Sequence, residues 1–152
     1  MTTIAIVPAG YKNDYRDYLN VPGKDVTGAL RLVDGSVSVV SGTAADSYVG
    51  LIPFQAGARF LIDDKSVYCA DFGAGTTTVN LGVVYSDSTT DDPDAFASLS
   101  AAPQSGGFIT VDEITGMSLV TPTTGWLVVQ LKAAAADATA SITFRVGVAY
   151  DS

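Results

Sequence analysis

The stretch TTVNLGVVY, residues 77–85, decides the fold of this chain. Within it Val79, Leu81, Val83 and Tyr85 alternate with Thr78, Asn80, Gly82 and Val84. A period of two is the spacing of side chains on one face of a β-strand, so the stretch predicts a half-buried strand. Residues 140–150, ASITFRVGVAY, alternate in the same way and predict a second strand.

Similar runs, separated by Gly, Pro, Asp and Ser, continue outward from these two strands over the chain from residue 36. We expect about eight strands, because residues 59–62 and 66–70 form either a hairpin or one long strand with a bulge. The expected strands lie at 37–40, 48–54, 59–62, 66–70, 77–85, 108–111, 117–120, 125–131 and 140–150. Turns this frequent favour an all-β fold, a two-sheet β-sandwich or jelly roll, over a parallel sheet with helical connections. The alanine run at 133–136 is too short to hold a helix alone and is expected to be a hairpin loop.

One short helix is expected among the strands. Asp92 supplies an N-cap acceptor, and Pro93 suits the first helical position. The predicted helix runs over 93–100, with Phe96 and Leu99 on one face.

Composition excludes several classes of function. The chain has 152 residues, a net charge of −8 and only 16% charged residues, against roughly 25% in an average domain. Its few basic residues are scattered, so a nucleic-acid partner is not expected. The shortage of charge has two readings: Thr and Ser keep a β-surface hydrated, or partner subunits cover part of the surface. There is no histidine, which removes the usual general base, so an enzyme is the least expected class.

The cysteine content and the hydropathy pattern indicate the compartment in which the chain folds. Cys69 is the single cysteine and lies in an apolar run, so we expect a buried, unreactive thiol and no intrachain disulfide. The apolar stretch at residues 4–9 is too short for a signal peptide and contains proline. No apolar run approaches the roughly 20 residues of a membrane helix, so no membrane partner is expected. We expect the chain to fold in a cytoplasm.

Residues 1–35 differ from the rest and are expected to form an extended N-terminal arm, followed by a β-domain at 36–152. Three tyrosines in the arm have the spacing i, i+4, i+7, which places them on one face of a helical turn. The candidate partner-binding residues are Tyr11, Tyr15, Arg16 and Tyr18. Tyr and Arg are enriched at interfaces, which favours an arm that reaches a neighbouring subunit over a segment that packs back on its own domain.

The acidic residues allow one metal hypothesis. Asp87, Asp91, Asp92 and Asp94 form the densest cluster, and oxygen-rich loops bind Ca²⁺. The spacing is not that of an EF-hand, and helix capping by Asp92 with solvated neighbours explains the cluster at less cost, so no cofactor is expected. The pairs Asp63–Asp64 and Asp112–Glu113 do not qualify as catalytic carboxylates, because neighbours in a strand point to opposite faces.

Residues 50–150 resemble the head decoration (cement) proteins of tailed bacteriophages. The likeness lies in the strand beginning at residues 57–63, the Gly-rich turn and Thr-rich strand at 67–83, and the DDPDAF corner at 91–96. The resemblance implies a structural virion protein with a β-sandwich or jelly roll, bound to the outer surface of an icosahedral head. It also implies the major capsid protein as partner, a homo-oligomer that is commonly a trimer, and a stay in the host cytoplasm during assembly.

Two alternatives stay open at this point. The first is a tail, neck or fibre component of a virion, which would share composition and fold. The second is a carbohydrate-binding module, which requires exposed aromatic rings on one sheet face. The candidates for such a platform are Tyr68, Tyr85, Trp126 and Tyr150, although Trp126 begins an apolar strand and is expected in the core.

Overall fold

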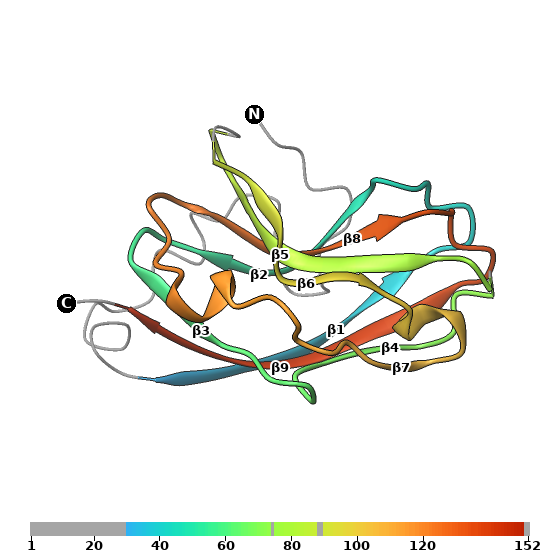
Figure 1. Cartoon of the computed structure of the whole chain (residues 1–152), viewed down its shortest axis with the longest axis horizontal. Coiled ribbons are helices and arrows are strands. Elements are labelled where there is room, and N and C mark those ends of the chain that lie inside the picture. The colour runs from blue at the N-terminus through green and yellow to red at the C-terminus, as the bar shows by residue number, and fades with distance from the viewer. Residues whose placement is uncertain (1–29, 74, 88–89, 151–152) are drawn as a thin grey trace.

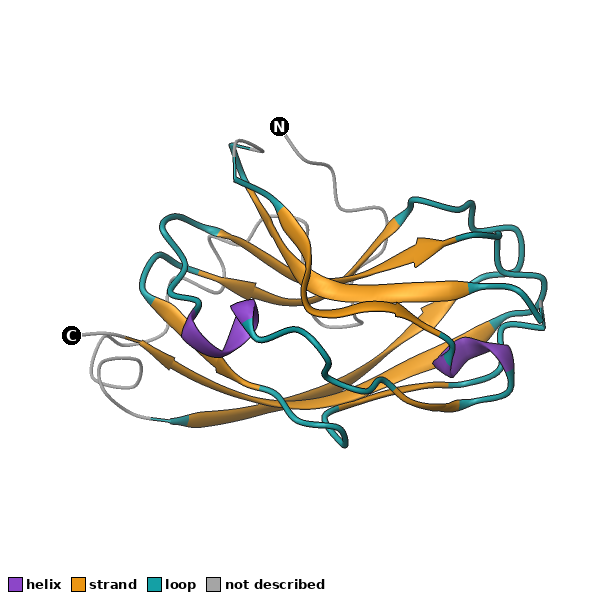
Figure 2. Ribbon diagram, viewed as in Figure 1, coloured by secondary structure: helices purple, strands orange, loops and turns teal. Residues whose placement is uncertain are grey.

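The computed structural model describes residues 30–73, 75–87 and 90–150. The candidate arm residues Tyr11, Tyr15, Arg16 and Tyr18 lie outside the described residues. The strands of the described part are β1 (Arg31–Val39), β2 (Tyr48–Phe54), β3 (Ala58–Leu61), β4 (Val67–Cys69), β5 (Thr78–Tyr85), β6 (Asp92–Ser100), β7 (Gly107–Phe108), β8 (Gly125–Lys132) and β9 (Ala140–Tyr150). Two short 3₁₀ helices, η2 (Ala102–Gln104) and η3 (Thr115–Ser118), interrupt them (Figure 2). The first strand therefore begins at Arg31, before the expected start at residue 36.

The protein is a β-sandwich of two antiparallel sheets (Figure 1). Sheet 1 has the order β1-β9-β4-β7, and β3 also pairs with β9. Sheet 2 has the order β2-β8-β5-β6. Of the described residues, no helix is long and apolar enough to cross a membrane.

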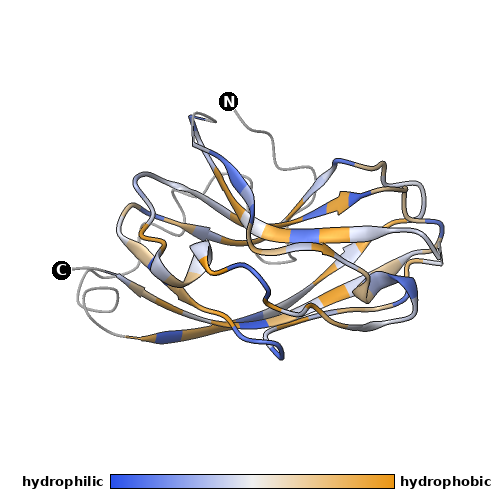
Figure 3. Cartoon of the chain, viewed as in Figure 1, coloured by the Kyte–Doolittle hydropathy of each residue, from blue (hydrophilic) through white to orange (hydrophobic). Residues whose placement is uncertain are grey.

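The main hydrophobic core lies between the two sheets. Sheet 1 contributes alternate residues of β9, among them Ile142, Phe144 and Val146, while Thr143 and Arg145 face outward. Figure 3 shows the resulting change between hydrophobic and hydrophilic residues along the strands. The alternation in the sequence therefore predicted the inward face of β9 correctly.

Strand β5 departs from the half-buried strand that its alternation predicts. Almost every residue of it is buried, and the same holds for β2 and β8, so both faces of these three strands are shielded from solvent. The outer face carries a second hydrophobic cluster, made of Val84, Trp126 and Val128 with Tyr48 packed against it. Trp126 is thus buried as expected, but on the side of the sheet opposite the main core.

The two strand segments at residues 59–62 and 66–70 follow one another along β9. Ala58–Leu61 pairs with the C-terminal part of β9, and Val67–Cys69 pairs with its middle. Both are antiparallel to β9, so they form one interrupted strand rather than a hairpin. The interruption is a turn in which Asp63 Oδ1 accepts hydrogen bonds from the Lys65 amide at 2.8 Å and the Ser66 hydroxyl at 3.1 Å.

The helix predicted over 93–100 is wrong, because these residues form the edge strand β6. Proline is compatible with an edge strand at a bulge, and the register slips here: Val83 faces Asp92, whereas Leu81 faces Ala97. Phe96 is 2% exposed and belongs to the main core. Burial of this ring between the sheets outweighs the local helix-start signal.

Two further expectations change. The strand expected at 117–120 is replaced by η3, where a Cβ on Gly116 would lie 2.2 Å from Cδ1 of Phe96, so the chain approaches the core too closely for any side chain. Residues 133–136 form a loop as expected, but it joins sheet 2 to sheet 1 rather than closing a hairpin.

Gly82 allows the backbone of β6 to approach β5 closely. A Cβ at this position would lie 2.2 Å from the backbone oxygen of Asp92 and 2.3 Å from the carbonyl carbon of Pro93. The main chain at the start of β6 therefore crosses directly over β5 at Gly82. Because the obstructing atoms are backbone, only glycine fits beneath this crossing.

Candidate binding surface

The outer face of sheet 1 carries one row of exposed side chains across four strands. Ser36 of β1 faces Thr143 of β9, Thr143 faces Tyr68 of β4, and Tyr68 faces Phe108 of β7. The row changes from hydroxyl groups to aromatic rings within one sheet width. It is an amphipathic strip whose four members are placed opposite one another by the strand register.

The two aromatic rings form a fixed pair. The ring centroids of Tyr68 and Phe108 lie 5.2 Å apart at an interplanar angle of 75°, an edge-to-face arrangement. Tyr68 is 39% exposed and Phe108 is 49% exposed. A Cβ on Gly106 would lie 3.2 Å from the Tyr68 hydroxyl oxygen, so the phenol extends over that glycine. Both rings thus present apolar surface to solvent while their backbones are paired.

Charged groups stand beside the row. Arg145 is directly opposite Asp34 in the register of β1 and β9, and its guanidinium donates to Asp34 Oδ2 at 3.4 Å. Their side chains are 70% and 67% exposed, so solvent screens this ion pair. Lys65 is exposed at the turn before β4, and its ammonium forms no salt bridge with the residues that the structure describes.

These residues surround an open hollow of about 680 Å³. We call it the aromatic hollow; its lining includes Asp34, Ser36, Lys65, Tyr68, Phe108 and Arg145. The hollow sits on the sheet surface rather than inside the sandwich, so a ligand reaches it without any rearrangement of the core.

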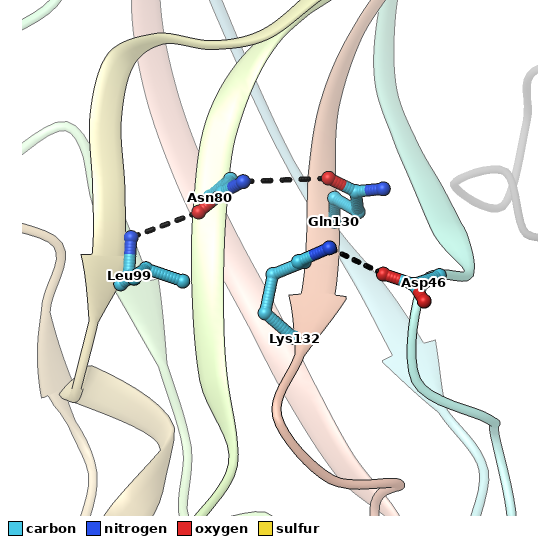
Figure 4. A network of polar contacts seen from close by, with 5 residues as sticks. All are labelled: Asp46, Asn80, Leu99, Gln130 and Lys132. Atoms are coloured by element: carbon cyan, nitrogen blue, oxygen red, sulfur yellow. Dashed lines mark hydrogen bonds and ion pairs between the residues drawn. The ribbon is translucent and has the colours of Figure 1, made fainter.

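The outer face of sheet 2 is polar at one end. Figure 4 shows Asn80 between two partners: its Nδ2 donates to Gln130 Oε1 at 3.3 Å, and its Oδ1 accepts the Leu99 amide at 2.8 Å. Leu99 has a positive φ of 52°, which is strained for a side chain of this size, and the Asn80 bond holds it there. Lys132 donates to Asp46 in the same region, and this hydrogen bond raises the pKa of Lys132. These contacts fix the edge of the sheet and are structural.

The acidic residues that suggested a calcium site make separate contacts in the structure. Asp91 Oδ1 accepts the Tyr85 amide at 2.7 Å. Burial raises the pKa of Asp92, and a hydrogen bond with Asp94 raises it further. The helix-capping role expected for Asp92 is wrong, because there is no helix here. Over residues 30–73, 75–87 and 90–150, no three acidic, histidine or cysteine side chains gather in a way that could hold a metal ion.

The carboxylate pairs fix loops. Asp64 Oδ1 accepts the Val111 amide at 2.8 Å, and Asp112 Oδ1 accepts the Ser98 amide at 3.1 Å. Asp63 closes the turn before β4. The carboxylates of Asp63, Asp64 and Asp112 thus accept hydrogen bonds from their own loop or a neighbouring one, which accounts for their positions without any catalytic role.

The single thiol is closed to solvent. Cys69 is 0% exposed in β4 and is free of any disulfide. Burial raises its pKa to about 12, so the reactive thiolate is not populated at neutral pH. The expectation of a buried, unreactive cysteine is confirmed.

Of the four aromatic residues proposed for a glycan platform, one is exposed. Tyr85, Trp126 and Tyr150 are 2%, 4% and 8% exposed, whereas Tyr68 lies at the surface. Its partner Phe108 was missed, because nothing in the sequence gives the pairing of β4 with β7. The alternation of β9 did place Thr143 and Arg145 on the outward face.

Comparisons with known proteins agree on the fold. No protein-family model matches the chain, and no curated protein sequence matches it. Two solved structures have a similar fold. A chain in the capsid of Ralstonia phage GP4 aligns with a TM-score of 0.56 and 16% identity, covering 83% of this chain and 87% of that chain. A chain in the capsid asymmetric unit of cyanophage Pam1 aligns with a TM-score of 0.53 and 20% identity, covering 94% of this chain and 99% of that chain.

Proposed function

We propose that this chain is a structural virion protein, a decoration (cement) protein that binds the outer surface of a tailed-phage head and stabilises it through interfaces. The observation that carries the proposal is the shared fold with two chains of phage capsids over 83% and 94% of this chain. The strand orders of the two sheets also support a jelly roll, a fold common in capsid proteins.

The proposed partner is the major capsid protein, and the proposed state is a homo-oligomer, a trimer in particular. The low fraction of charged residues, 16%, fits a surface that partner subunits cover in part. A standard interface buries roughly 1,600 Å², and a trimer multiplies weak single contacts through avidity. Stabilisation of the head then needs interface area and no catalytic group.

Within this proposal the N-terminal arm contacts the capsid surface. Tyr11, Tyr15, Arg16 and Tyr18 supply the rings and the guanidinium that commonly dominate binding energy at interfaces. The protein would be made in the host cytoplasm and reside on the outer capsid surface of the virion.

Co-sedimentation with heads from which this chain has been stripped tests the role. We expect saturable binding at a fixed ratio to the major capsid protein, and the ratio would indicate which symmetry positions are filled. If the folded, oligomeric protein does not bind mature heads, the head role is wrong. A tail, neck or fibre location would then take its place, and immunolabelling of virions would distinguish among these.

One observation favours a second candidate, a saccharide-binding role. The exposed Tyr68–Phe108 pair stands beside hydroxyl and charged groups on one sheet face. The two roles are compatible, since a protein on the outside of a head can bind the capsid with one surface and a ligand with another.

A further inference from the structure

The aromatic hollow offers different chemistry on its two sides. Tyr68 and Phe108 form an apolar side, while Ser36, Thr143 and Arg145 form a polar side. Sugars match such a division, because a pyranose ring has an apolar face of C–H groups and an edge of hydroxyl groups. Stacking of the C–H face on an aromatic ring leaves the hydroxyls free to bond to the polar side.

The size of the hollow suits a small ligand better than a protein surface. Sites for small molecules have volumes of roughly 300–1,000 Å³. The volume of about 680 Å³ falls in that range. A stable protein interface needs roughly 800 Å² on each partner and a dry apolar centre. Here the ring pair is flanked directly by hydroxyl and charged side chains.

The charge of the hollow indicates an acidic ligand. The described residues include five basic side chains: Arg31, Arg59, Lys65, Lys132 and Arg145. Two of them, Lys65 and Arg145, line the hollow, and Asp34 is the single acidic residue in its lining. In the lining itself positive side chains thus outnumber negative ones, although the chain as a whole has a net charge of −8.

The Arg145–Asp34 pair does not block such a ligand. Exposed ion pairs contribute little net free energy, so a ligand carboxylate can replace Asp34 on Arg145, or share Arg145 with it, at small cost. The guanidinium can also bind a carboxylate through two parallel hydrogen bonds.

The backbone of Lys65 is held in place because its turn is hydrogen-bonded from two sides. Asp63 Oδ1 accepts the Lys65 amide at 2.8 Å, and the Ser66 carbonyl accepts the Arg145 amide at 2.8 Å. The second bond ties the turn to β9, which carries Arg145 itself. The two basic residues are therefore placed by one connected piece of backbone.

We propose that the aromatic hollow binds an acidic saccharide, one whose sugar ring carries a carboxylate. The C–H face of the ring packs on Phe108 and Tyr68, and the carboxylate binds Arg145 with Lys65 nearby. The ring hydroxyls bond to Ser36 and Thr143. This site does not depend on the capsid role, because it lies wholly within one described sheet.

Binding is tested on the full-length chain with an array of acidic and neutral glycans. The best acidic ligand and its neutral counterpart, for example galacturonic acid and galactose units in the same oligosaccharide, are then titrated by calorimetry. We expect saturable binding of the acidic form and a neutral form weaker by about tenfold, the effect of one charge-assisted hydrogen-bonded contact.

Three variants locate the site. Phe108→Ala and Arg145→Gln should each weaken binding by about tenfold, and Ser36→Phe should abolish it by filling the hollow and removing one hydroxyl partner. Met117→Ala is the matched control, since Met117 is an exposed apolar residue on η3, outside the hollow, and it should bind like the wild type. Circular dichroism confirms that each variant is folded.

The proposal is overturned if no acidic glycan on the array binds saturably. It is also overturned if Phe108→Ala, Arg145→Gln and Ser36→Phe all bind as tightly as the wild type. A polyglutamate peptide serves as the competing probe: if it binds at the hollow and no acidic glycan does, the site recognises a protein segment instead.

Discussion

Thr121 shows how much one buried hydroxyl can hold. The residue is 2% exposed; its Oγ1 accepts the Ala58 amide at 2.9 Å and donates to the Gln55 carbonyl at 2.8 Å. Its backbone also bonds to Gly57 and Ala58. The segment before β8 is thereby fastened to the corner between β2 and β3, where the chain passes from sheet 2 to sheet 1.

Replacing Thr121 with valine keeps the shape and removes both hydroxyl bonds. The Ala58 amide and the Gln55 carbonyl would each lose a partner, so we expect a loss of about 1–3 kcal/mol in the free energy of unfolding, measured by urea denaturation. The control is Thr110→Val at an exposed position, which should change stability by less than about 0.5 kcal/mol. Equal stability of the two variants would show that water replaces the lost bonds.

Single residues differ in how far the sequence foretells them. Cys69 lies in an apolar run, and burial followed directly from that run. Thr121 gave no signal, because a threonine near a proline and a glycine reads as a surface turn. Its burial depends on packing against the corner at Gln55, a contact between residues far apart in the sequence.

Strand β6 is the element in which local and tertiary preferences conflict most. Asp92 followed by Pro93 is a good helix start, yet Ala95, Phe96 and Ala97 are buried in the main core. A helix has one core-facing stripe, whereas an edge strand with bulges places three consecutive residues against the core. The helix-cap signal can be read from the sequence. The open edge of β5, with which this segment pairs as a strand, is a feature of the tertiary structure and cannot be read from it.

The same strand makes stability depend on pH. Burial raises the pKa of Asp92 above its ordinary value of 3.8, as do the hydrogen bond with Asp94 and the negative charges of Asp94 and Glu113. An acid with a higher pKa in the folded state holds its proton more tightly there. Folding stability therefore falls as pH rises from 3.8 through the raised pKa, and the full benefit is present below 3.8.

Asp92→Asn removes this titration while its amide can still donate to Asp94. We expect the variant to have a higher Tm than the wild type at neutral pH, and the difference should shrink as the pH falls below 3.8, where the wild-type carboxyl is also neutral. Thermal melts over a pH series provide the measurement. A difference that stays constant over the whole series would mean that the charge of Asp92 is not its cause.

The pairing register of the strands that form the aromatic hollow could not be predicted from the sequence. The outward positions Thr143 and Arg145 could be predicted from the alternation of β9. Phe108 joins them because β7, only two residues long, pairs with β4. A strand this short carries no periodic signal, so the second ring of the hollow emerged only from the fold.

At the scale of the whole molecule, the main core lies between the two sheets. Among the residues that the structure describes, its buried members run from Val37 to Tyr150. The sequence foretold this class of fold well, because frequent turns and two strongly alternating strands leave few other architectures. The division of strands between the sheets was not predictable, since it depends on which faces meet.

Deletion of residues 1–20 tests whether the arm serves binding rather than folding. We expect the truncated chain to remain folded and oligomeric by analytical ultracentrifugation, and to lose co-sedimentation with stripped heads. A full-length variant with alanine at Tyr11, Tyr15, Arg16 and Tyr18 is the matched test, and it should show the same loss. Undiminished binding by either protein would refute the role of the arm.

The two poles of the sandwich differ in what they carry. Arg31 lies opposite Val148 in the register, so the described chain enters and leaves at one pole. At the other pole the Gly42 amide bonds to the Ala136 carbonyl at 2.8 Å, which joins the loops after β1 and β8, and Ala44 and Ala45 are exposed there. A foreign epitope inserted between these two alanines would lie a full strand length from Arg31, where β1 begins, so the sandwich could present cargo at one pole without disturbing the strand ends at the other.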